Sequence, residues 1–152
     1  MNTATWSKRA VRVLLGLQIA IASILFLATP AYAANTANTS YSFWFSGTGA
    51  TQGATWRRKT TDSVCYLRIS HLGLNRMNFY IDGSTQYDGH AVNRTRGGVA
   101  TAYYTGHFVI HNYVNENGES WARLTAMSPS GSGAVSGVWS PDSNEPWHTS
   151  LN

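Results

Sequence analysis

Apolar and polar residues alternate along much of the chain beyond residue 40. At the first such stretch Tyr41, Phe43 and Phe45 occupy every second position, and Trp44 is the only apolar exception between them. Successive side chains of a β-strand point to opposite faces, so this two-residue period predicts a strand. The same pattern predicts strands at residues 63–70, 77–82, 99–104, 107–114, 120–127 and 134–140.

Sustained helical periodicity is absent beyond residue 33, and glycine-containing turn signals such as "YDGH", "NENG" and "PSGSG" separate the predicted strands. We therefore expect an all-β fold. Seven short antiparallel strands suit a β-sandwich over residues 41–140, with a small β-barrel as the alternative.

The N-terminus has the three parts of a secretory signal peptide: basic residues, an apolar stretch at 13–28, and small residues before Ala34. We expect residues 1–33 to be a signal peptide cleaved between Ala33 and Ala34. The alternative is a retained membrane anchor, because the apolar stretch is close to the shortest length that can span a bilayer. Residues 34–40 are then a flexible leader and residues 141–152 a flexible C-terminal tail. The product would be secreted, extracellular and monomeric, without a stable membrane anchor.

Removal of residues 1–33 leaves eight basic and seven acidic residues, a net charge of +1. This balance gives no reason to expect a nucleic-acid partner. The local cluster Arg57-Arg58-Lys59 is interpreted as a solvated loop. Cys65 is the only cysteine, so no intramolecular disulfide can form, and we interpret it as a small buried residue rather than a reactive thiol.

His107 and His111 are four residues apart, the spacing of the two histidines in the zinc motif H-E-x-x-H. On a strand, that spacing separates them by about 13 Å, too far to share one ion easily. His71, His90 or His148 could join either of them after folding, but no spacing supports this. We predict no metal site and no cofactor.

The segment between residues 107 and 127 predicts a hairpin with a three-residue loop in which Gly118 takes the left-handed position. Among short loops this register best separates apolar from polar side chains. This register places six residues on the inner face of the hairpin, namely Phe108, Ile110, Val114, Ala122, Leu124 and Ala126. It also pairs Tyr113 with Trp121 and His111 with Arg123 on the outer face, and these four residues form the predicted ligand-binding site.

No nucleophile elbow, phosphate-binding loop or calcium-binding loop occurs, so we assign no catalytic residue and predict that the protein is not an enzyme. Asp82 and Glu119 could form a glycosidase pair in space, but the sequence cannot rank such pairs.

The stretches "HNYVNENGESWARLTA" and "AVSGVWSPDS" resemble a family of small secreted proteins from Gram-positive bacteria that has no assigned function. The resemblance implies export and a compact β-domain, and it supplies no catalytic residues. Sixteen aromatic residues follow residue 33, more than a core of this size needs. We therefore expect a non-enzymatic protein that binds cell-wall glycan or a surface protein, with a bacteriocin-like toxin as the alternative.

Overall fold

A computed structural model describes residues 33–152, so the predicted signal peptide, apart from Ala33, lies outside the described residues. The described chain forms one compact unit. Its elements are β1 (Thr39–Phe45), β2 (Thr51–Gly53), β3 (Arg57–Arg58), β4 (Cys65–Leu72), β5 (Met77–Ser84), β6 (Val92–Asn93), β7 (Ala100–Ala102), β8 (Gly106–Ile110), the 3-10 helix η1 (Asn115–Asn117), β9 (Trp121–Met127), β10 (Gly133–Ser140) and β11 (Thr149–Ser150).

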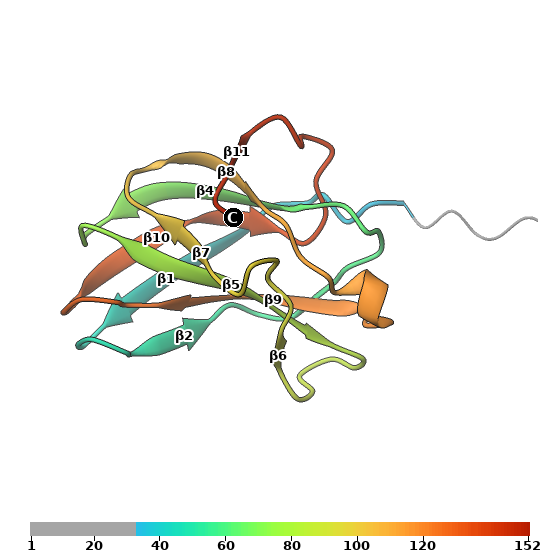
Figure 1. The fold of residues 1–152 in the computed structure, drawn as a ribbon, viewed down its shortest axis with the longest axis horizontal. Helices are drawn as coiled ribbons and strands as arrows, with labels where there is room; N and C mark the ends of the chain where they lie inside the picture. The colour runs from blue at the N-terminus through green and yellow to red at the C-terminus, as the bar shows by residue number, and fades with distance from the viewer. Residues whose placement is uncertain (1–32) are drawn as a thin grey trace, which may run out of the picture. The chain divides into compact units, whose positions relative to one another are not determined.

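The strands form two sheets, and neither closes into a barrel (Figure 1). Sheet A has the order β1-β10-β4-β8-β11, and sheet B has the order β2-β9-β5-β6, with β3 paired to β9 and β7 to β5. All pairings are antiparallel except that of β11 with β8. The prediction of an all-β sandwich is confirmed.

Each of the seven predicted strands has a counterpart in the structure. The alternation that predicted them also sorts the side chains: in β1 the buried residues are Tyr41, Phe43 and Phe45, and the residues between them are exposed. Inward side chains of both sheets form one core, in which Leu67 and Trp139 of sheet A join Phe79 and Leu124 of sheet B. Burial of these alternate positions stabilises the sandwich.

The predicted hairpin is wrong. Strand β8 pairs with β4 in sheet A, whereas β9 pairs with β5 in sheet B, so η1 carries the chain from one sheet to the other. The face assignment nevertheless holds, because all six predicted inner residues are buried. Gly118 does take the left-handed conformation, with φ at 72°. The alternation of apolar and polar residues shows which side of a strand is buried. Because a sandwich buries the inner face of both sheets, the same pattern cannot identify which strand lies beside it.

The two ends of the described chain are held against the domain. Strand β1 begins at Thr39, two residues before the predicted start of order, and Asn35 donates its backbone N–H to Asp142 over 2.8 Å. At the other end, β11 pairs with β8, and Leu151 donates a hydrogen bond to the carbonyl of Val109. The dark red C-terminal segment in Figure 1 therefore adds a strand to sheet A, which differs from the flexible tail expected.

The basic cluster is also not a solvated loop. Arg57 and Arg58 form β3, and the side chain of Lys59 is buried beside Asp142. Sequence composition could not predict this, because the partner carboxylate is 83 residues away. Within residues 33–152, no helix is long and apolar enough to span a membrane.

Candidate functional site

The four predicted site residues do not form the pairs expected of them. Trp121 lies on the outer face of sheet B, where the ring of Tyr87 meets it edge-on at 5.1 Å and the guanidinium of Arg58 lies 5.3 Å from its centre. Arg123 also lies on sheet B and binds Asp82 at 3.0 Å. Two of the four residues thus share a sheet face, each with other partners.

Tyr113 and His111 follow β8. The guanidinium of Arg96 lies 5.0 Å from the ring centre of Tyr113, and the backbone of His111 exchanges hydrogen bonds with the side chain of Asn152. The predicted pairs fail because β8 and β9 belong to different sheets.

A pocket of about 500 Å³ opens on the outer face of sheet A. Tyr66 of β4 and His107 of β8 form its floor, because each precedes a residue that points into the core, Leu67 and Phe108. The end of β10, the chain beyond it and the segment before β1 supply the rest of the lining, which comprises Thr36, Asn38, Ser140, Asp142, Ser143, Asn144, Glu145 and His148.

Three rings meet in this pocket. The hydroxyl of Tyr66 and Nδ1 of His107 share a hydrogen bond of 2.8 Å. The ring of His148 lies 5.4 Å from that of His107 and 5.7 Å from that of Tyr66, measured between centres. Nε2 of His148 lies 2.7 Å from a carboxylate oxygen of Glu145. We call Tyr66, His107, Glu145 and His148 the ring cluster.

Partial burial, followed by the negative charge of Glu145, raises the pKa of Tyr66, while Arg68 opposes the shift. Its hydroxyl therefore remains a neutral phenol that can donate or accept a hydrogen bond at physiological pH. In the part of the chain that the structure describes, no group of three or more His, Cys, Asp or Glu residues is placed to hold a metal ion.

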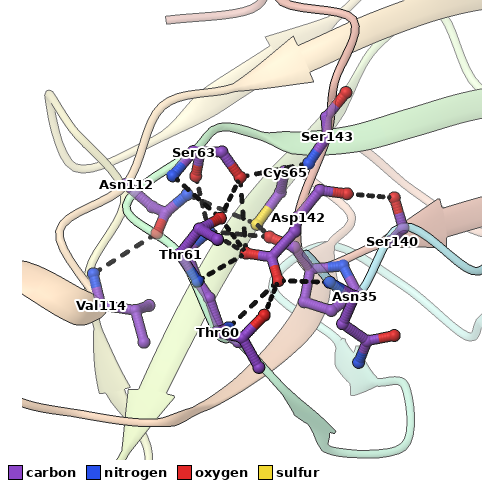
Figure 2. A network of polar contacts seen from close by, with 12 residues as sticks. Asn35, Thr60, Thr61, Ser63, Cys65, Asn112, Val114, Ser140, Asp142 and Ser143 are labelled. Atoms are coloured by element: carbon purple, nitrogen blue, oxygen red, sulfur yellow. Dashed lines mark hydrogen bonds and ion pairs between the residues drawn. The ribbon is translucent and has the colours of Figure 1, made fainter. Parts of the chain in front are cut away.

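Asp142, which lines the pocket, lies at the centre of a network of polar contacts (Figure 2). Its carboxylate accepts hydrogen bonds from the backbone of Asn35 and from both the backbone and the hydroxyl of Thr60 and Thr61. Burial alone would raise the pKa of Asp142, but these bonds and the charge of Lys59 outweigh it and lower the pKa to about 2. Asp142 therefore acts as a fixed structural anion that joins three distant segments.

Sequence reasoning missed the ring cluster. His107 was singled out, but with His111 as its neighbour, and His148 lies in the segment interpreted as a tail. The two histidines meet because β11 pairs with β8 and brings the preceding loop over the sheet. His148 is one of three histidines that could join His107 after folding, but no spacing in the sequence distinguishes it from the other two.

Comparison with known proteins finds no match among curated proteins and none among solved structures. A sequence family does match residues 29–143, which is most of the chain. That family has no assigned function, in agreement with the resemblance noted from the C-terminal motifs. The chain belongs to the family described as "Protein of unknown function (DUF2712)".

Proposed function

We propose that this is a secreted, non-enzymatic binding protein of the extracellular space or cell envelope, and that the pocket on sheet A is its ligand site. Export is supported by the basic, apolar and small-residue pattern of residues 1–33. The observation that carries the proposal is the pocket itself, whose volume of about 500 Å³ lies within the usual range for small-molecule sites.

The lining of the pocket favours a polyhydroxylated ligand such as a cell-wall glycan fragment. It combines hydroxyl and amide groups with the carboxylate of Glu145, which can accept hydrogen bonds from sugar hydroxyls. The rings of Tyr66 and the two histidines add flat surfaces for the apolar faces of a sugar. Trp147, 73% exposed and 6.2 Å from the ring of His148, lies beside this lining and could extend it.

The contacts of Ser140, Ser143 and Cys65 support the non-enzymatic part of the proposal. The hydroxyl of Ser140 donates to the carbonyl of Asp142, and the hydroxyl oxygen of Ser143 accepts from the backbone of Glu145. The thiol of Cys65 is fully buried, and burial raises its pKa to about 11. A nucleophile needs a nearby base or a lowered pKa, and these groups have neither in the contacts described.

The carboxylates considered for glycoside hydrolysis are engaged as well. Asp82 binds Arg123, and Glu119 forms a bidentate pair with Arg94. The arginine partners occupy carboxylate oxygens that a glycosidase would direct at its substrate.

Binding of the purified protein to isolated peptidoglycan sacculi and to soluble glycan fragments tests the proposal. Tyr66→Ala removes a ring and a hydroxyl from the pocket floor, and we expect it to weaken binding about tenfold or more. Tyr113→Ala removes an exposed tyrosine that does not line the pocket and serves as the matched control. Thermal unfolding of both variants checks that the fold is retained.

The assignment of the pocket as the ligand site would be contradicted if the protein bound neither sacculi nor glycan fragments. It would also be contradicted if Tyr66→Ala and Tyr113→Ala bound equally well. Growth inhibition of related strains without retention on cell walls would instead support the bacteriocin-like alternative. Release of soluble sugar from the sacculi would show that the protein is an enzyme.

A further inference from the structure

We propose that His107 and His148 form a binding site for a divalent transition-metal ion such as Zn²⁺, at the floor of the pocket on sheet A. This inference rests on the geometry of the ring cluster alone and does not depend on the proposed binding of glycan. It goes beyond the sequence, in which the two residues are separated by 40 others.

The spacing of the two rings fits a shared ion. Their centres are 5.4 Å apart. An imidazole bound to zinc places its ring centre about 3.2 Å from the metal, so two imidazoles in a tetrahedral site have their centres about 5.2 Å apart. His107 and His111, by contrast, project from positions separated by about 13 Å along an extended chain.

Each imidazole also has the outer partner that metal-binding histidines usually have. Nδ1 of His107 bonds to the hydroxyl of Tyr66, and Nε2 of His148 bonds to Glu145. Such partners fix the orientation of the ring, and a carboxylate partner makes the opposite nitrogen a better ligand. Among the described residues, no hydrogen bond engages Nε2 of His107 or Nδ1 of His148, so both nitrogens are without a protein partner.

The tautomers required are compatible with the neighbouring groups. An ion on Nε2 of His107 requires Nδ1–H to donate to Tyr66, whose hydroxyl oxygen lies within hydrogen-bond distance and can accept it. An ion on Nδ1 of His148 requires Nε2–H to donate to Glu145, which a carboxylate accepts readily.

Two imidazole ligands favour borderline ions such as Zn²⁺, Cu²⁺ and Ni²⁺ over Ca²⁺ and Mg²⁺, which prefer oxygen. Water, or a donor group of a molecule bound in the pocket, would complete the coordination, because the protein supplies fewer than the four ligands of a structural zinc site. His107 is exposed and His148 is partly exposed, so an ion can reach both from solvent.

Isothermal titration of Zn²⁺ into the chelator-treated protein near neutral pH tests the site. We expect one ion to bind per chain, and His107→Ala and His148→Ala should each weaken binding about tenfold or more. His111→Ala is the matched control, since it removes the histidine at motif spacing from His107, and it should leave affinity unchanged. Mg²⁺ should give no heat of binding.

Nitrogen NMR of the histidine rings provides a second, independent measurement. Zn²⁺ should shift Nε2 of His107 and Nδ1 of His148 and leave the ring of His111 unaffected. Unchanged affinity in both cluster variants, or an equal loss in His111→Ala, would overturn the proposal. Because the titration contains no glycan, a failure to bind Zn²⁺ would leave the proposed glycan binding untouched. A failure to bind glycan would likewise leave the proposed metal site untouched.

Discussion

The ammonium of Lys59 lies 3.2 Å from the carboxylate of Asp142, and neither side chain is exposed to solvent. Lys59 also donates to the backbone carbonyls of Ser63 and Pro141, so its charge is fully coordinated within the protein. The pair joins the chain before β4 to the chain after β10, next to the pocket. Rigidity of the pocket wall therefore depends on a buried charge pair.

Replacing Asp142 with Asn should strongly destabilise the protein. The amide removes the negative charge and leaves the buried ammonium of Lys59 uncompensated, which typically costs about 3 to 5 kcal/mol. Urea denaturation near neutral pH measures the loss. Glu116→Gln provides the control, because Glu116 is exposed in η1, and its stability should stay close to that of the unmodified protein. A loss below about 1 kcal/mol for Asp142→Asn would show that the network tolerates an unpaired lysine.

Stability should fall in acid through the same carboxylate. The pKa of Asp142 is about 2 in the folded protein, below its ordinary value of 3.8, so the unfolded chain takes up the proton first as pH falls. The stabilisation is complete above about pH 4 and is lost between about pH 4 and pH 2, a change of roughly 2 kcal/mol. Denaturation measured at several pH values should show a smaller acid slope for Asp142→Asn. Equal slopes for the two proteins would assign the effect to other groups.

The strands could be predicted from the sequence because alternation is a local property of each segment. Tyr41, Phe43 and Phe45 already show which face is buried, whatever strand lies beside them. Pairing is not local: β8 could lie beside β9 or in the opposite sheet without changing the burial of Phe108. The hairpin hypothesis failed at this step, although its assignment of inner residues was confirmed.

The candidate site could not be predicted for a related reason. Its residues come from the segment before β1, from β4, from β8, from the end of β10 and from the loop before β11, which only the tertiary fold brings together. Composition also hid the roles of charged residues, since Lys59 resembles part of a solvated basic run until Asp142 is placed beside it.

Cys65 should be chemically inert in the folded protein. Its side chain is fully buried, the thiol lies 3.1 Å from the carbonyl of Pro141, and burial raises its pKa to about 11. Thiol reagents attack the thiolate, which is scarce at neutral pH when the pKa is so high. We expect labelling with a chromogenic disulfide reagent to be slow in buffer and rapid in concentrated urea. Fast stoichiometric labelling of the native protein would contradict the buried position.

Two tryptophans on neighbouring sheets should respond differently to truncation. Trp139 is fully buried on the inner face of β10, so Trp139→Ala should leave a cavity and cost about 3 to 5 kcal/mol. Trp121 is only partly buried on the outer face of β9, where it contacts Arg58 and Tyr87, and Trp121→Ala should cost about 1 kcal/mol. Urea denaturation of the two variants measures the difference.

Trp121→Ala and Tyr66→Ala together separate the two candidate binding surfaces. Trp121 does not line the pocket on sheet A, so Trp121→Ala should bind isolated cell walls as well as the unmodified protein does. Tyr66→Ala, which does alter the pocket, should bind less. If Trp121→Ala kept its stability and lost binding, the result would place the ligand on the outer face of sheet B instead, because a loosened fold would not account for the loss of affinity. An equal loss of stability in Trp121→Ala and Trp139→Ala would mean that Trp121 is packed as tightly as a core residue.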